Sequence, residues 1–346
     1  MQAAIYGLSG PVLTEDERSF FHDADPAAYI LFKRNCLDPA QVRALTDSLR
    51  GLSGRADLPI LIDQEGGRVA RMQPPEWPKF PCGWAFAELY DKAPSSAIEA
   101  ARVNARALAL MLRSAGVNVD CLPLLDVRRP EADEIIGDRS LGSDPMQVAA
   151  LGRAVLDGLA RAGIAGCIKH MPGHGRACAD SHKELPTVEA DEAELETDLE
   201  PFRTLRNAPI GMTAHVRYTA WDAENPGTLS PVVIKEVIRG RIGFSGLLLT
   251  DDIDMEALAG SVPERAERAI AAGCDIVLNC WAKMDDMVGI AERLPVISNM
   301  AQKRLDHALS GTEVVQQGSE TAHAGAERAR LAAKRDALLD LARDVA

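Results

Sequence analysis

The sequence predicts an α/β fold, a closed (β/α)8 TIM barrel with catalytic loop insertions at its C-terminal face. Eight short apolar runs recur along the chain, amphipathic helical stretches separate them, and each run ends in polar or glycine-rich residues. Runs that are apolar throughout are typical of parallel strands buried on both faces. Eight such units in roughly 280 residues fit a closed barrel, which takes ~250 residues, better than an open sheet.

The eight strands are expected in order along the chain. Their runs are residues 4–10, 28–35, 58–67, 117–127, 164–173, 209–216, 246–255 and 274–281. Three of the intervals that follow these runs are unusually long, so the barrel is expected to depart from regular spacing. We interpret them as functional insertions at the C-terminal ends of strands. They are residues 68–95, 128–144 and 171–190.

Two of the intervening helices carry clear start signals. Ser96 and Glu99 form a capping box that predicts a helix ending at Gly116. Ser230 and Pro231 supply an N-cap and a first helical position for a later helix. We expect residues 1–310 to form the barrel domain and residues 311–346 to form a C-terminal helical tail packed on its exterior. A dimer contact is the alternative role for this tail.

Composition narrows the class of protein. The chain has 346 residues, 47% of them hydrophobic, and a net charge of −13 from 38 basic and 51 acidic residues. Such a charge repels nucleic acid, and no basic cluster compensates for it. No run approaches the ~18 apolar residues of a membrane span, and the N-terminus lacks signal-peptide features, so we expect a cytoplasmic protein. The sequence leaves monomer and homodimer open.

The seven cysteines are expected to be reduced thiols. They are odd in number, widely spread, and never form a C-x-x-C pair. This pattern is typical neither of a disulfide framework nor of a zinc ribbon.

Polar residues at the strand ends are the candidates for chemistry, because the C-terminal ends of barrel strands converge on one mouth. They follow strands three to seven in the chain. They are Asp63, Glu65, Arg68 and Arg71; Asp126 and Arg139; Lys169 and His170; His215; and Asp251, Asp252 and Asp254.

A metal site is the first possibility to weigh. His170, His174 and His182, with Asp63 or Asp251, offer the nitrogen and oxygen ligands that zinc takes. However, the Pro-Gly turn between His170 and His174 breaks the helical spacing of an H-x-x-x-H ligand pair, and no H-E-x-x-H occurs. Metal and cofactor chemistry are therefore not expected.

Acid and base catalysis is the second possibility. Asp180 stands two residues before His182, so its carboxylate can fix the imidazole tautomer and leave the other nitrogen to exchange protons. We expect the turn at Gly173 and Gly175 to let this histidine swing. Asp251 ends an apolar strand, where burying a carboxylate costs free energy unless the carboxylate is paired or has a function in the site. The alternative is that it only caps the next turn.

Five motifs in this chain together resemble family 3 of the glycoside hydrolases, in particular its single-domain bacterial β-N-acetylhexosaminidases. They occur in the family's order, and the K-H-x-P-G-H-G run with D-S-H is highly specific. The motifs are LIDQEGGRVAR (61–71), IGDRSLGSDP (136–145), IKHMPGHGRACADSHKELP (168–186), MTAHV (212–216) and LLLTDDIDM (247–255). Met171, Ile253 and Asp254 depart from the common pattern, which puts fine specificity in doubt.

The resemblance implies a retaining mechanism with Asp251 as nucleophile and His182, held by Asp180, as acid and base. It also implies side chains that hold the terminal sugar, namely Asp63, Arg71, Arg139, Lys169 and His170. The implied reaction is exo-hydrolysis of terminal β-linked N-acetylglucosamine from small carbohydrates, the anhydro-muropeptides of cell-wall recycling.

Four alternatives remain open at this point. Within the family, the chain could be a β-glucosidase, although those enzymes usually carry a second domain. A neutral histidine base does not repel an anion, so phosphate could replace water and give a phosphorylase. A metal-dependent hydrolase and a non-catalytic sugar-binding barrel are the alternatives from other classes.

Overall fold

The computed structural model describes residues 1–312 and 322–344, and within them eight parallel strands close into a barrel. The strands neighbour one another in the order β1-β10-β9-β7-β5-β4-β3-β2. Their bounds are β1 Gln2–Gly7, β2 Pro26–Leu31, β3 Ile60–Ile62, β4 Val119–Asp120, β5 Ala165–Met171, β7 Ile210–Thr213, β9 Leu247–Asp252 and β10 Ile276–Asn279. Each strand falls in or overlaps one of the eight expected runs, so the predicted (β/α)8 barrel is confirmed.

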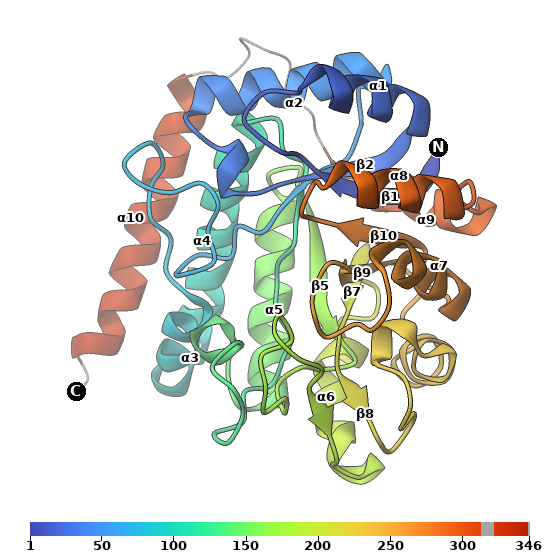
Figure 1. Ribbon diagram of the computed structural model, residues 1–346. Coiled ribbons are helices and arrows are strands. Elements are labelled where there is room, and N and C mark those ends of the chain that lie inside the picture. Colours follow the sequence, from blue (N-terminus) through green and yellow to red (C-terminus); the bar gives the residue numbers. More distant parts are fainter. Residues whose placement is uncertain (313–321, 345–346) are drawn as a thin grey trace.

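Helices surround this barrel (Figure 1). In the described residues they are α1 Glu15–Ala24, α2 Pro39–Ser53, α3 Gly83–Lys92, α4 Pro94–Ser114, α5 Pro145–Ala160, α6 Glu192–Thr204, α7 Val262–Ala272, α8 Met284–Arg293, α9 Asn299–Leu309 and α10 Ala322–Asp344. Shorter or wider helical pieces are η1 Lys33–Asn35, η2 Gly137–Arg139, η3 Gly227–Leu229 and the π-helix η4 Val233–Ile242. A two-stranded sheet lies outside the barrel and consists of β6 Thr187–Val188 and β8 Arg217–Tyr218.

One of the two predicted helix starts is wrong. Helix α4 begins at Pro94, with no side-chain cap, and the Glu99 carboxylate instead binds Arg102 and Lys334, each at 2.6 Å. Proline is favoured at the first helical position, so it fixes the start before Ser96 is reached. The other start is confirmed, because Ser230 Oγ accepts a hydrogen bond from the Val233 N–H at 3.1 Å.

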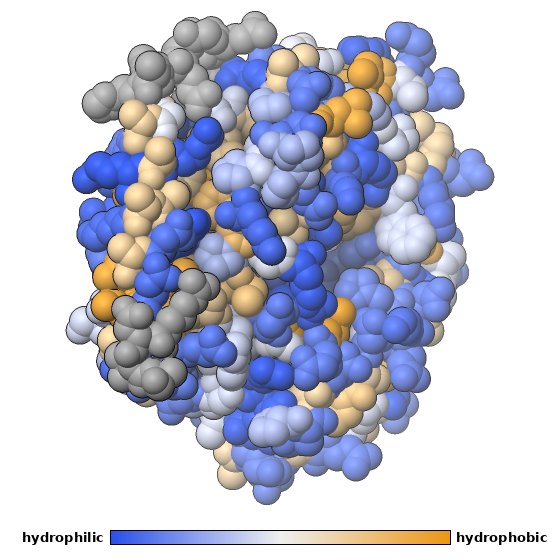
Figure 2. Space-filling model, turned by 90° about the vertical axis from the view of Figure 1, so that its left-hand side faces the viewer, coloured by the Kyte–Doolittle hydropathy of each residue, from blue (hydrophilic) through white to orange (hydrophobic). Residues whose placement is uncertain are grey.

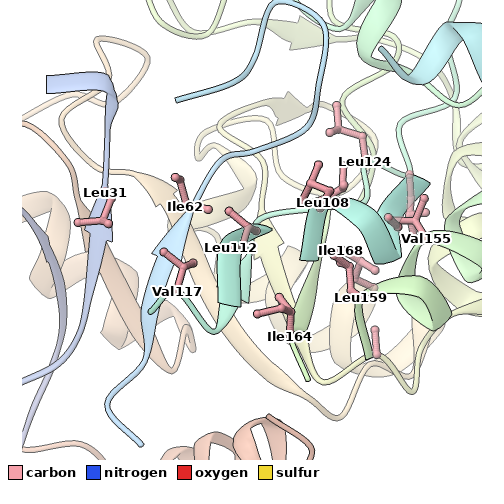
Figure 3. Packing of buried hydrophobic residues seen from close by; sticks show 14 of the residues in the cluster. Leu31, Ile62, Leu108, Leu112, Val117, Leu124, Val155, Leu159, Ile164 and Ile168 are labelled. Atoms are coloured by element: carbon pink, nitrogen blue, oxygen red, sulfur yellow. The ribbon is translucent and has the colours of Figure 1, made fainter. Parts of the chain in front are cut away.

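The apolar core has two main parts. One fills the space between the barrel and its helices, and Figure 3 shows Leu108 and Leu112 of α4 beside Val155 and Leu159 of α5. The other fills the barrel interior with side chains such as Ile5 and Leu61. A barrel filled in this way is a packed core rather than a pore, which leaves its mouth for binding.

The tail helix α10 lies along α4 at the outside of the molecule (Figure 1). Leu331 is buried there, and Arg335 donates a hydrogen bond to Asn104 Oδ1 at 3.1 Å. The start of the predicted tail partly lies outside the described residues, at 313–321, and the division at residue 310 stays a prediction.

The surface, the helices and the thiols complete the description. The face in Figure 2 is largely hydrophilic, and it is hollowed near its centre. In the described part of the chain, no helix combines the length and apolar character needed to cross a membrane. The seven cysteines are free thiols, and five of them are buried.

Candidate active site

A cavity of ≈ 270 Å³ opens at the C-terminal ends of the barrel strands. Seven of the eight predicted site residues line it, and the eighth, Asp180, contacts one of the seven. The seven are Asp63, Arg71, Arg139, Lys169, His170, His182 and Asp251. Strand β3 and strand β9, which lead into Asp63 and Asp251, lie on opposite sides of the barrel order. The cavity therefore has two chemically different ends.

At the β3 end, buried charges form one ion-pair network. Lys169 Nζ lies 2.9 Å from Asp63 Oδ1 and 2.8 Å from Glu65 Oε1. Arg71 binds the other Asp63 oxygen at 3.0 Å, and Arg139 holds Glu65 with two hydrogen bonds of 2.8 Å. Two carboxylates thus face three cations, an arrangement that fixes each side chain and keeps hydrogen-bonding groups directed into the cavity.

The network also fixes the charge states. Burial alone would raise the pKa of Asp63, but the Lys169 and Arg71 charges hold it well below its usual range. The pKa of Glu65 falls to about 2, because Arg139 and Lys169 outweigh its burial. Those carboxylates in turn raise the pKa of Lys169 despite its desolvation. All these groups are therefore ionised at neutral pH.

A glycine turn after β3 brings Glu65 into this network. Gly66 has φ 98°, and a Cβ at that position would lie 2.2 Å from the Pro81 carbonyl oxygen. Only glycine fits such a close approach in this backbone region. The turn closes with a 2.9 Å hydrogen bond from the Glu65 N–H to the Val69 oxygen.

Asp126 organises the start of the loop after β5. Its Oδ2 lies 2.8 Å from His170 Nδ1, and its Oδ1 accepts hydrogen bonds from the backbone N–H groups of His170 and His174, at 3.2 and 2.7 Å. The pKa of Asp126 falls to about 2 because these contacts outweigh its burial. An ionised carboxylate only accepts, so His170 Nδ1 donates to Asp126, and Nε2 is the ring nitrogen left for a ligand.

Asp251 and Asp252 differ in what surrounds their carboxyl groups. Burial acts to raise the pKa of Asp251, but His170, His215 and the Asp252 N–H, at 2.8 Å from Oδ1, lower it. Burial and the nearby Asp254 carboxyl raise the pKa of Asp252 well above its usual range. Asp251 is therefore the ionised carboxylate of the pair, which favours it over Asp252 as a nucleophile.

His215 contacts the backbone at the end of β9. Its Nδ1 lies 2.7 Å from Thr228 Oγ1 and its Nε2 lies 2.8 Å from the Asp252 carbonyl oxygen. Because a carbonyl only accepts, Nε2 carries a proton and donates to Asp252, which orients the ring. Burial lowers the pKa of His215, and the ring positions the backbone beside Asp251.

His182 and Asp180 form a pair on the loop after β5. His182 Nδ1 and the His182 backbone N–H both lie 2.9 Å from Asp180 Oδ1. The His182 side chain is 60% exposed, whereas that of Asp180 is 20% exposed. Burial acts to raise the pKa of Asp180, but hydrogen bonds from His182 and Lys183 lower it. His182 therefore lines the cavity with its Nδ1 held by an anion and with Nε2 outside that ion pair.

The loop is anchored at its glycines. The Tyr218 hydroxyl donates to the Gly173 carbonyl at 2.8 Å, and a Cβ on Gly175 would lie 1.9 Å from the Val127 oxygen. The backbone of Ala177 accepts a 2.9 Å hydrogen bond from Asp133. These glycines permit close packing of the loop. The expected swing of His182 stays a prediction.

Three contributors were not assigned from the sequence. Glu65 and Asp126 stood among the strand-end candidates, but their partners lie 74 and 44 residues away in the chain. Phe32 lines the cavity, and the Arg34 and Arg71 guanidinium groups each lie 5.0 Å from its ring centroid. Its only sequence signal is its position at the end of the second apolar run.

The histidines that the structure describes do not assemble with carboxylates into a metal-ligand set. Across residues 1–312 and 322–344, no three His, Cys, Asp or Glu side chains are grouped so that they could hold a metal ion. His170 Nδ1 and His182 Nδ1 each bind an aspartate instead.

Comparisons with known proteins agree with these features. The profile described as "Glycosyl hydrolase family 3 N terminal domain" matches residues 6–310. A β-hexosaminidase of Alkalilimnicola ehrlichii is 40% identical over 279 residues, 79% of each chain. A β-hexosaminidase of Tolumonas auensis is 37% identical over 311 residues, covering 88% of this chain and 89% of its own.

Solved structures show the same likeness. NagZ from Neisseria gonorrhoeae in complex with N-trifluoroacetyl-D-glucosamine superposes with a TM-score of 0.86 and 31% identity, covering 96% of this chain and 98% of that one. A family 3 β-N-acetylglucosaminidase from Paenibacillus superposes with a TM-score of 0.83 and 30% identity, covering 96% and 67%. The predicted resemblance is confirmed, and the chain belongs to family 3 of the glycoside hydrolases.

Proposed function

We propose that this glycoside hydrolase is a retaining exo-β-N-acetylglucosaminidase. The observation that carries the proposal is the two-ended cavity, with an ionised Asp251 at one end and the Asp63–Lys169–Glu65–Arg139 network at the other. A closed charged end suits a terminal sugar whose hydroxyl groups need donors and acceptors. The β-hexosaminidase relatives and the N-trifluoroacetyl-D-glucosamine complex of the gonococcal NagZ support an N-acetylated sugar.

Binding would place the sugar across the mouth. Asp63, Arg71, Arg139, Lys169 and His170 are the proposed contacts to its hydroxyl and N-acetyl groups. Their mutual ion pairs hold them in place before the sugar arrives, which lowers the entropic cost of binding. The anomeric carbon would then lie beside Asp251.

The first chemical step would form a covalent glycosyl-enzyme. An Asp251 oxygen attacks the anomeric carbon as the bond to the leaving oxygen breaks, and imidazolium His182 gives that oxygen a proton from Nε2. Most retaining glycosidases use a second carboxylate for this proton. Here Asp180 would stabilise the imidazolium through Nδ1 and would keep the ring oriented.

The second step would release the sugar. Neutral His182 takes a proton from an incoming water molecule, whose oxygen attacks the anomeric carbon and displaces Asp251. Phosphate remains the alternative acceptor, because a neutral imidazole does not repel an anion. In that reaction the product would be a sugar 1-phosphate.

The proposed cellular role rests on the family resemblance. We propose cell-wall fragments, the anhydro-muropeptides of peptidoglycan recycling, as the natural substrates. The cytoplasmic location and the choice between monomer and homodimer stay predictions.

One experiment tests the proposed reaction. The purified chain is given a chromogenic N-acetyl-β-glucosaminide and the matching β-glucoside, with a chelator present and with or without phosphate. We expect hydrolysis of the first substrate alone, and a loss of more than about 10⁴-fold in Asp251→Ala. Turnover of the glucoside alone would contradict the proposed substrate. Loss of activity with chelator would favour a metal-dependent hydrolase.

A further inference from the structure

An exposed tryptophan follows β10 at the rim of the cavity. Trp281 is 59% exposed and is the one aromatic side chain among the exposed large hydrophobic residues that the structure describes. Its neighbour Cys280 lines the cavity, as does Asp252, to which the indole is bonded. A large aromatic surface left in water beside a binding cavity is typical of a contact surface for a ligand.

Although it is exposed, Trp281 is held in one position. Its Nε1–H donates to Asp252 Oδ2 at 3.1 Å, and its backbone N–H donates to Asp254 Oδ2 at 3.2 Å. Ala282 has φ 56°, in the left-handed region that non-glycine residues rarely adopt. The Lys283 ammonium lies 5.0 Å from the indole centroid. The ring is therefore oriented before any ligand arrives, which is how a binding platform gains affinity.

The barrel order places this platform beside the strand that carries the proposed nucleophile. The proposed sugar site runs from Asp63 after β3 to Asp251 on β9, which lie opposite each other, and β10 is the neighbour of β9. A terminal sugar with its anomeric carbon at Asp251 directs its leaving group away from the β3 end. Asp252 lines the cavity on that side, and its carboxyl group contacts Trp281.

We propose that Trp281 is the platform on which a leaving group that is itself a sugar ring stacks. This inference rests on the proposed function. The apolar C–H face of a pyranose covers the indole and removes it from water, which strengthens binding of the substrate. A leaving group without a ring does not provide this binding energy. The enzyme should thus prefer disaccharide-type substrates.

The test compares two substrates whose leaving groups are both alkoxides. They are N,N′-diacetylchitobiose, which offers a sugar ring, and methyl N-acetyl-β-glucosaminide, which does not. In Trp281→Ala, kcat/KM for the disaccharide should fall about 10-fold, whereas that for the methyl glycoside should change less than about twofold. The ratio of the two values does not depend on how much of the variant is folded.

A second variant separates the ring from its N–H group. Trp281→Phe keeps a stacking surface but loses the bond to Asp252, so it should restore most of the preference for the disaccharide. A Phe variant no better than Ala, or an equal loss on both substrates, would overturn the inference.

Controls separate this inference from the proposed function. The inhibition constant of N-acetylglucosamine should be the same in Trp281→Ala as in the unchanged chain, because that sugar fills only the inner cavity. Val296→Ala, which shortens another exposed apolar side chain, should leave both substrates unaffected. If the unchanged chain cleaves neither substrate, the proposed function itself fails, whatever Trp281 does.

Discussion

His182 is the residue whose role depends most on the leaving group. It is exposed, and Asp180 holds its Nδ1, so its proposed task is to carry protons at Nε2. A positioned general acid contributes ~10² to 10⁴ in rate. His182→Ala should therefore slow alkyl and sugar glycosides by about that factor, and should slow formation of the glycosyl-enzyme much less for a dinitrophenyl glycoside, which needs no protonation.

Azide provides the matching rescue. As a nucleophile that needs no general base, it should speed turnover of the dinitrophenyl glycoside by His182→Ala and should yield a glycosyl azide of retained configuration. It should not rescue Asp251→Ala in this way. Equal losses on good and poor leaving groups would contradict the role of His182 as acid.

His174 is a buried neutral histidine, and this makes it a source of pH-dependent stability. Burial and the neighbouring His170 lower its pKa from 6.5 to about 4. Its Nε2 lies 3.2 Å from Ser181 Oγ, and its Nδ1 has no partner. Between pH 6.5 and 4 the unfolded chain binds a proton that the folded chain does not, so this contribution to stability is lost as the pH falls through that window.

The effect is measured by urea unfolding at pH 7 and pH 5. The free energy of unfolding should fall by about 1–2 kcal/mol more in the unchanged chain than in His174→Asn, whose side chain does not titrate. The same contribution from His215, and the opposing ones from Asp120 and Asp252, are common to both proteins and cancel in the comparison. Parallel pH dependences would contradict a neutral buried His174.

At the scale of residues, the sequence predicts which side chains meet but not what each contacts. Lys169, His170 and Asp251 were found because a polar residue that ends an apolar strand must face the barrel mouth. The pairing of Asp126 with His170 depends on the position of two loops, which no local pattern encodes. The charge states depend on burial, which also arises only from the folded chain.

At the scale of elements, α10 is attached to the barrel helices by the buried Leu331, the partly buried Leu338 and Leu339, and a set of polar contacts. Leu331 is 4% exposed, whereas Leu341 on the same helix is 42% exposed. Leu331→Ala should therefore lower the free energy of unfolding by about 2–4 kcal/mol, and Leu341→Ala should lower it by less than about 1. Denaturant unfolding followed by circular dichroism measures both.

Activity is the second readout for this helix. Leu331 lies outside the cavity, so kcat should be unchanged in both variants at a temperature where they are folded. A loss of kcat in Leu331→Ala would instead connect α10 to the site. The connection would run through Phe80. The Arg335 guanidinium carbon lies 5.7 Å from the Phe80 ring centroid, and the Phe80 carbonyl oxygen accepts a 2.9 Å hydrogen bond from the Gly67 N–H.

Helix starts show where local signals succeed and where they fail. Ser230 caps its helix as expected, because its partner, the Val233 N–H, is three residues away. Ser96 and Glu99 carry the same kind of signal, yet Pro94 starts the helix earlier, and Lys334 takes the Glu99 carboxylate from 235 residues away. A capping pattern therefore holds where no tertiary partner competes for its side chains.

At the scale of the whole molecule, the count of eight apolar runs predicts closure of the barrel. The side chains inside it pack into one apolar cluster, so the C-terminal mouth is where charged residues from distant strands meet. The sequence could not predict the register between strands, such as Leu61 beside Val119, because register depends on shear and tilt around the closed ring. Register decides which strand ends face each other.

A sugar that spans this mouth should stabilise the whole fold. The proposed site joins strand ends on opposite sides of the barrel, so global unfolding must break its contacts. N-acetylglucosamine at 100 times its dissociation constant should raise the free energy of unfolding by about 2.7 kcal/mol, seen as a higher Tm. Glucose at the same concentration should give a smaller shift, because it lacks the N-acetyl group.

Two variants show whether the shift arises at the cavity. Arg71→Met removes a proposed sugar contact that is 27% exposed, so the variant should keep its fold and lose most of the ligand-induced shift in Tm. Lys235→Met removes an 82% exposed cation on η4, which lies outside the cavity, and should keep the full shift. If both variants show the same ligand-induced shift in Tm, or if glucose and N-acetylglucosamine give the same shift, the sugar binds elsewhere on the molecule. The reason is that Arg71 can affect the shift only if the sugar contacts it at the mouth.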